Sequence, residues 1–131
     1  MALVESRRNT PFKWGEHDCA LFACDAVVEI TGFDPGKPFR GAYSTAIGAA
    51  RVLKSFAGGG LREAVELIAV EIGAQKVSPL FARRGDIGLI NDESEHGFAM
   101  AVCVGLSWAA PGKNGLKMRA VDNVIYAWRV E

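Results

Sequence analysis

A helical pattern over residues 18–31 constrains the fold of this chain more than any other feature of the sequence. Asp18 is a good N-cap, and Gly32 stands where a helix end favours a left-handed residue. Between those ends the only charges are Asp25 and Glu29, which are four positions apart and therefore share one face. A helix with so narrow a polar face must be buried on most of its sides, so we expect it to pack centrally against the rest of the chain.

The remaining elements are expected to fall into a helical half followed by a strand half. Ser44 is the expected cap of a helix through Phe56, which Gly58 to Gly60 end, and residues 61–72 form the next helix. Residues 2–9 form either a short polar helix or an arm. Strands are expected at 87–90, 97–104, 106–110, 116–118 and 124–130, with an Asn114-Gly115 hairpin signal. Helices followed by antiparallel strands predict an α+β fold in which N-terminal helices pack on a C-terminal sheet.

Length and charge narrow the class of protein. The 131 residues predict one domain over 1–131, and half of them are hydrophobic, which argues against disorder. Fifteen basic and fifteen acidic side chains cancel, so we expect no nucleic-acid partner. No window is long and apolar enough for a membrane segment or a signal peptide, so synthesis in a reducing cytoplasm is expected. The scattered cysteines and histidines show no metal-ligand spacing, and we expect neither metal nor cofactor.

The stretch from Phe12 to Cys19 is the segment whose residues point to catalysis. A thiol at the first position of a buried helix faces unpaired backbone N–H groups and the positive end of the helix dipole, and both favour the thiolate. Cys19 is therefore the candidate nucleophile, whereas Cys24 and Cys103 are expected in the core. A general base must lie within hydrogen-bond reach of the thiol.

The chain has two histidines that qualify as that base. His96 lies beside an acidic turn at 91–95 and is the first candidate, with exposure to solvent as its alternative. His17, two residues before Cys19, is the weaker alternative. Trp14, Gly15 and Asp18 are expected to line a substrate cleft, with Asp18 acting first as a helix cap.

These segments resemble the NlpC-type, papain-like cell-wall cysteine peptidases. Trp14-Gly15-x-x-Asp18-Cys19 is similar to the nucleophile motif of that family, and Arg84-Gly85-Asp86-Ile87 with the later Val102-Cys103-Val104-Gly105 is similar to its second block. The turn from Pro111 to Leu116 and the terminal Ala127-Trp128-Arg129-Val130 resemble a phage branch found among tail genes. The resemblance implies a papain-like fold, residence in the phage virion, tail or tail-tip proteins as partners, and hydrolysis of peptidoglycan amide bonds in active members.

The resemblance does not extend to the catalytic base. Alignment on Gly105 puts Ala99 where the family has its catalytic histidine, and His96 lies three residues earlier. No clear third catalytic residue follows among Leu106 to Ala110. Three readings therefore remain open: a peptidoglycan hydrolase that uses Cys19 and His96, a catalytically degenerate structural component of the tail, or a stand-alone amidase or acyltransferase that uses the same thiol.

Overall fold

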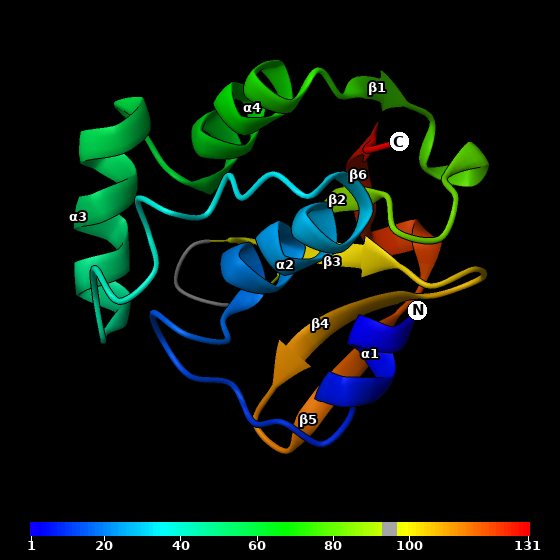
Figure 1. Ribbon diagram of the computed structural model, residues 1–131, viewed down its shortest axis with the longest axis horizontal. Coiled ribbons are helices and arrows are strands. Elements are labelled where there is room, and N and C mark those ends of the chain that lie inside the picture. Colours follow the sequence, from blue (N-terminus) through cyan, green and yellow to red (C-terminus); the bar gives the residue numbers. More distant parts are fainter. Residues whose placement is uncertain (93–96) are drawn as a thin grey trace.

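The structure is a computed structural model that describes residues 1–92 and 97–131 (Figure 1). The helices in these residues are α1 (Ala2–Arg7), α2 (Cys19–Thr31), α3 (Ala46–Ala57) and α4 (Leu61–Ile72). The strands are β1 (Gln75–Val77), β2 (Ile87–Asn91), β3 (Phe98–Cys103), β4 (Trp108–Gly112), β5 (Gly115–Arg119) and β6 (Val124–Arg129), with short 3-10 turns at Pro79–Phe81 and Val121–Asn123. The α+β class expected from the order of elements is confirmed.

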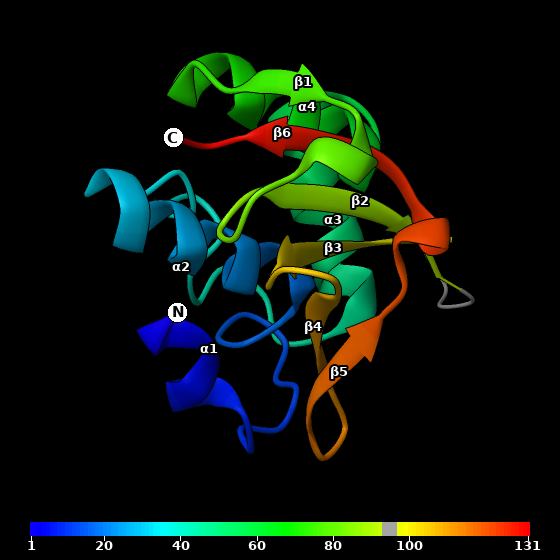
Figure 2. The ribbon, with the colours of Figure 1, turned by 90° about the vertical axis from the view of Figure 1, so that its right-hand side faces the viewer.

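The described strands form one antiparallel sheet in the order β1-β6-β2-β3-β4-β5. Figure 2 shows the strands one above another, with α2 and α1 to one side of them. Helix α2 packs mainly on β3, while α1 contacts α2 and β5, and α4 contacts α3 and β3. The helical half therefore covers the strand half, as expected.

The ends of α2 follow from its caps. The Asp18 carboxylate accepts a hydrogen bond from Leu21 N at 2.9 Å, and Gly32 ends the helix in the left-handed region at φ 78°. Both charged residues of α2 have partners: Asp25 pairs with Arg7 and Arg40, and Glu29 accepts a bond from Leu3 N. The narrow polar face of α2 is thus covered by α1 and by the loop that follows α2.

Some boundaries differ from the expected ones. Thr45, not Ser44, caps α3 through a bond from Gly48 N, and α3 extends to Ala57. Helix α1 ends at Arg7 rather than at residue 9. Strand β4 begins at Trp108 rather than at 106, and the β4–β5 hairpin pairs Gly112 with Gly115 around Lys113 and Asn114, one residue earlier than the Asn-Gly signal suggested.

The sheet is buried on both faces. Its helix-side face joins α2 and α4 in the main core, which includes Leu89, Met100 and Trp128. The opposite face carries a second cluster that includes Ile90, Ala101 and Trp108. Gly88 allows Trp108 to lie over β2, because a Cβ at Gly88 would stand 2.6 Å from the Trp108 ring. The burial of both faces explains why the central strands lack a polar-apolar alternation.

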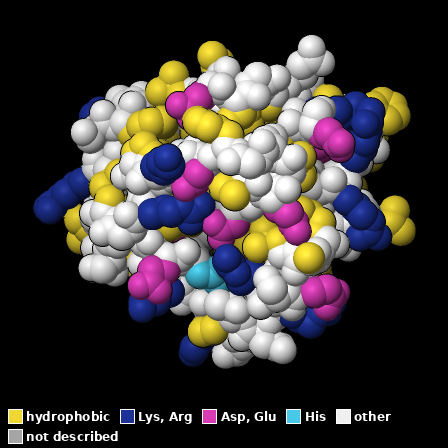
Figure 3. Space-filling model, viewed as in Figure 1, with side chains coloured by type: hydrophobic (Ala, Val, Ile, Leu, Met, Phe, Trp, Pro, Cys, Tyr) yellow, Lys and Arg dark blue, Asp and Glu magenta, His cyan; other side chains and the backbone are white. Residues whose placement is uncertain are grey.

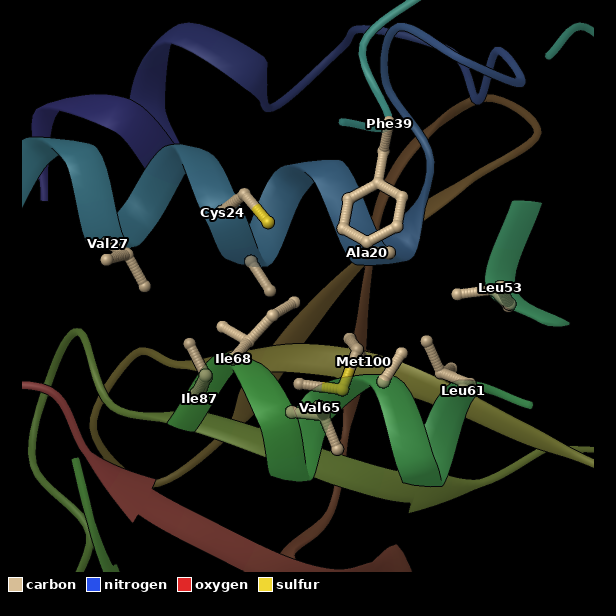
Figure 4. Close-up of a pocket in the computed structure, with 12 residues that line it drawn as sticks. Ala20, Cys24, Val27, Phe39, Leu53, Leu61, Val65, Ile68, Ile87 and Met100 are labelled. Atoms are coloured by element: carbon tan, nitrogen blue, oxygen red, sulfur yellow. The ribbon is translucent and has the colours of Figure 1, made fainter. Parts of the chain in front are cut away.

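A void of about 20 Å³ lies among side chains of α2, α4 and the neighbouring elements. Figure 4 shows the apolar side chains that surround it, among them Cys24, Val65, Ile68 and Met100. A void of this size with no polar partner stays dry, so it belongs to the packing of the core and offers no ligand site.

The surface shows no dominant sign of charge on the face drawn in Figure 3, where basic and acidic side chains are intermixed with apolar ones. This distribution agrees with the formal net charge of zero. In the described part of the chain, no helix has the length and the apolar content to cross a membrane.

Candidate functional site

Cys19 lies half-buried at the first position of α2 and lines a cavity of about 310 Å³. The wall of this cavity, called the cleft below, comes from the loop before α2, the loop before α3, the helices α3 and α4, and the strands β3 to β5. Its polar and aromatic members include Phe12, Trp14, Asp18, Tyr43, Asp92, Lys113, Lys117 and Arg119. The expected groove beside the thiol is therefore present in the structure.

Asp18 organises the wall of the cleft next to Cys19. Its buried carboxylate accepts three hydrogen bonds, from Leu21 N at 2.9 Å, from Gly15 N at 3.0 Å and from the Tyr43 hydroxyl at 2.6 Å. One carboxylate thus caps α2 and joins the loop before α2 to the loop before α3. With all three donors in place, Asp18 has a structural role that accounts for its burial.

Gly15 is not among the residues that line the cleft. Its backbone packs instead against the loop before α3. It adopts φ 80°, and its missing Cβ leaves space for the backbone carbonyl of Tyr43. Gly41 N donates to Gly15 O at 2.9 Å, so the two loops are also joined through their backbones. The backbone of Gly15 lies against the Tyr43 carbonyl, and only a residue without a side chain allows this approach.

The Trp14 ring contributes directly to the cleft, as expected. It packs edge-on against Phe12, with ring centroids 4.7 Å apart, and against Tyr43 at 6.4 Å. These three aromatic rings form a contiguous aromatic part of the cleft wall.

The thiol of Cys19 is not activated by its described surroundings. Burial raises its pKa to about 12, and the carboxylates of Asp18 and Asp92 act in the same direction. Hydrogen bonds from the backbone of Met100 and of Ala20 favour the thiolate but are outweighed. The expectation that the start of the helix would lower this pKa was wrong, because desolvation opposes the charged form more strongly than the helix end supports it.

His17, the weaker candidate base, lies outside the cleft. Its ring is buried, packs edge-on against Phe22, and places Nδ1 at 3.1 Å from Arg7 Nη1. Burial and the neighbouring Arg7 lower the pKa of His17. This histidine therefore belongs to the contact between α1 and α2, not to the site of Cys19.

The first candidate base, His96, lies outside the described residues. Ala99, at the position where the resemblance expects a histidine, lines the cleft, and Cys19 packs against the cluster that contains it. Ser107, the only polar residue in the region expected to supply a third catalytic group, lies in the β3–β4 turn beyond Cys103, at the end of β3 away from Ala99. Within residues 1–92 and 97–131, no other imidazole accompanies His17.

The other cysteines are buried, as expected. Cys24 lies in α2 beside Gly36, and Cys103 donates to Gly105 O at 3.4 Å. Asp86 accepts bonds from Arg83 N and Val130 N, which stabilise the turn before β2. Among the residues that the structure describes, no group of acidic residues, cysteines and histidines is placed to hold a metal ion.

Sequence reasoning missed several residues of the cleft. Tyr43 ends a loop that carries no local signal. Lys117 and Arg119 are two positions apart in an expected strand and therefore share a face, but only the hairpin with β4 brings that face to the cleft.

A comparison with protein families finds a match that covers nearly the whole chain. The family described as a domain of unknown function (DUF6950) matches residues 1–130. No curated protein matches the chain.

Proposed function

This chain belongs to the DUF6950 family. From its sequence motifs and the geometry of its cleft, we propose that it is a phage-tail protein of papain-like architecture that acts by docking rather than by catalysis. In this proposal the protein is made in the host cytoplasm and is carried in the virion. Its cleft keeps the shape of a cysteine-peptidase site but holds a neutral, unactivated thiol.

The arrangement of elements supports the papain-like part of the proposal. A buried helix with a cysteine at its first position packs across an antiparallel sheet, and the cysteine lies at a cleft between the helices and the strands. The phage-tail part is supported by the sequence motifs alone.

The observation that carries the loss of catalysis is the presence of Ala99 in the wall of the cleft that Cys19 also lines. A methyl group in this place cannot accept the thiol proton, and an adjacent base is what activates a cysteine nucleophile. The raised pKa of Cys19 agrees with this reading. The cleft wall contributed by β4 is formed by Ala110, Pro111 and Gly112, none of which has a side chain able to orient an imidazole.

A second candidate function is hydrolysis of an amide bond in peptidoglycan, with Cys19 as nucleophile and His96 as base. The observation in its favour is the place of Cys19, a partly exposed residue at the start of α2 that lines a cavity of about 310 Å³. In this reaction His96 would take the thiol proton while sulfur attacks the carbonyl carbon. The same proton would then pass to the leaving amine, and water would release the acyl group from sulfur.

Alkylation of Cys19 distinguishes the two functions. We would measure the rate of its reaction with iodoacetamide against pH, with the modified cysteine identified by peptide mass mapping. The proposal expects little reaction below pH ~8.5 and the same profile in His96→Ala, because an unpaired thiol reacts only as it ionises.

His17→Gln is the matched control, since His17 lies outside the cleft and its loss should leave the profile of Cys19 unchanged. Rapid alkylation near pH 6 that His96→Ala abolishes would refute the docking proposal and establish a Cys19–His96 pair. A cell-wall digestion assay that compares the wild type with Cys19→Ala then tests hydrolysis directly.

A further inference from the structure

His17 is a buried titratable group that lies outside the cleft. Its side chain is 5% exposed and packs edge-on against Phe22. Its Nδ1 atom lies 3.1 Å from Arg7 Nη1. Because a guanidinium group only donates, Nδ1 must accept this bond, and in the neutral ring Nε2 then carries the hydrogen. The Nε2 atom is buried, and within the described residues it has no hydrogen-bond partner.

A second proton can bind to this ring only at Nδ1. Its arrival removes the acceptor of the Arg7 bond and places an imidazolium against a guanidinium 3.1 Å away. In agreement with this geometry, burial and the neighbouring Arg7 lower the pKa of His17. The ring therefore resists protonation while α1 is in place, whereas a ring in water takes up a proton at pH ~6.5.

The two carboxylates near His17 are already engaged with other groups. Asp25 Oδ2 pairs with Arg7 at 2.9 Å, and Asp25 Oδ1 pairs with Arg40 at 2.8 Å. Both oxygens of Asp18 accept hydrogen bonds, from two backbone amides and one phenol. An imidazolium at His17 would therefore have to compete with cations and donors that are already in place.

The turn that carries His17 is firmly held. The backbones of His17 and Lys13 exchange two hydrogen bonds, at 2.8 and 3.0 Å, and the Lys13 side chain forms an exposed ion pair with Glu16 at 3.2 Å. The next residue, Asp18, fixes the end of this turn to the start of α2. The ring cannot leave its place without disruption of this turn.

Helix α1 is attached by fewer contacts. Of its six residues only Val4 is buried. Its polar attachments to α2 are the bond from Leu3 N to Glu29 at 3.3 Å and the Arg7 contacts described above. Figures 1 and 2 show α1 at the edge of the fold. Since a helix of this length is not stable in isolation, α1 is the element that depends most on the Arg7 contacts.

We propose that His17 makes the docking of α1 sensitive to acid: protonation of the ring breaks its contact with Arg7, and α1 leaves the surface of α2 while the rest of the chain stays folded. Release of α1 uncovers an apolar surface that is buried beneath Val4 and includes Phe22, Ala26, Val102 and Ala109. This inference goes beyond the proposed docking function and does not rest on it, because neither Arg7 nor His17 lines the cleft.

The direction and size of the effect follow from proton linkage. Because the pKa of His17 is lowered while α1 is docked, the released state binds the proton more tightly, and acid favours release. The ratio of docked to released molecules should fall about tenfold for each pH unit below ~6.5, until the pKa of the docked ring is reached. Between pH ~7.5 and pH ~5 the fall is up to about 30-fold.

Hydrogen exchange measured by NMR on the full chain tests the proposal. The Leu116 amide donates to Arg8 O at 3.0 Å and loses this bond when α1 leaves, whereas the Cys103 amide donates to Asp86 O at 2.8 Å and reports unfolding of the sheet. Each protection factor is taken relative to the unstructured rate at the same pH. The factor of Leu116 should fall by up to about 30-fold from pH ~7.5 to pH ~5, and should stay below that of Cys103 at both.

Two variants assign the effect to one imidazole. His17→Asn keeps an oxygen acceptor near the place of Nδ1 but does not titrate, so the fall at Leu116 should disappear. His96→Ala removes the other histidine of the chain and should keep the fall seen in the wild type. Because His96→Ala leaves His17 as the only imidazole, the proposal stays testable even if His17→Asn does not fold.

Three outcomes overturn the proposal. The first is a Leu116 protection factor that does not change with pH in the wild type. The second is equal protection of Leu116 and Cys103, which would mean that α1 leaves only when the whole chain unfolds. The third is a fall that persists in folded His17→Asn or is lost in His96→Ala.

Discussion

The hydrogen bond between Tyr43 and Asp18 offers the most direct test of how the cleft is built. The phenol donates to a buried carboxylate at 2.6 Å, and this bond joins the loop before α2 to the loop before α3. Burial raises the pKa of Tyr43, and the adjacent Asp18 carboxylate opposes phenolate formation further, so the hydroxyl remains a donor throughout the pH range of interest.

Tyr43→Phe removes the hydroxyl and leaves the aromatic ring. A hydrogen bond to a charged group contributes about 1.5–3 kcal/mol, and Asp18 keeps its two backbone donors in the variant. We therefore expect the free energy of unfolding to fall by about 2 kcal/mol. With a typical urea dependence of about 2 kcal/mol per molar for a small domain, the midpoint should fall by about 1 M.

The assay is urea unfolding followed by circular dichroism, with Tyr126→Phe as the control. The Tyr126 hydroxyl also has a partner, since it accepts a bond from Arg62 at 3.0 Å, but this pair is exposed and its loss should cost less than about 1 kcal/mol. Equal shifts in the two variants would refute the reasoning. In an Asp18→Asn background the effect of Tyr43→Phe should shrink, because the charged acceptor is gone.

Two further variants test other parts of the structure. Gly15→Ala should destabilise the chain by more than Gly32→Ala in urea unfolding, because both positions have similar positive φ (80° and 78°) but only a Cβ at Gly15 collides with the Tyr43 backbone. Equal losses would show that backbone strain alone acts at Gly15. His17→Gln should reduce the loss of stability on acidification below pH 6.5, the ordinary imidazole pKa, because the lowered pKa in the folded state means that the unfolded chain binds more protons there. Unfolding at a series of pH values measures this loss, and identical pH profiles in both proteins would contradict it.

The helices were predictable because their ends carry local signals. Asp18 and Gly32 bound α2, and the left-handed Gly73 ends α4, so both helices have the expected limits. The start of α3 was misplaced by one residue because Ser44 and Thr45 are both able to cap, and only the folded backbone selects Thr45. Strand β1 was missed because its three residues have no buried alternation and its pairing with β6 is non-local.

The place of Cys19 at the start of a helix was predictable from the sequence. The burial and the charges around its thiol were not. A cysteine after an N-cap is visible in the sequence, and so is the mismatch at Ala99. The burial of the Cys19 thiol and the approach of Lys117 and Arg119 to the cleft depend on the packing of α2 against β3 and on the β4–β5 hairpin. These long-range contacts have no local signature.

The thiol of Cys19 shows why a helix start does not by itself make a cysteine reactive. A rise in pKa from 9.0 to about 12 corresponds to about 4 kcal/mol against the thiolate. The helix dipole contributes only about 0.3–2 kcal/mol in favour of an anion at its N-terminus, so desolvation prevails. Activation at this position therefore requires a cation in contact with sulfur. An imidazolium beside the thiol would supply it, but Ala99 does not.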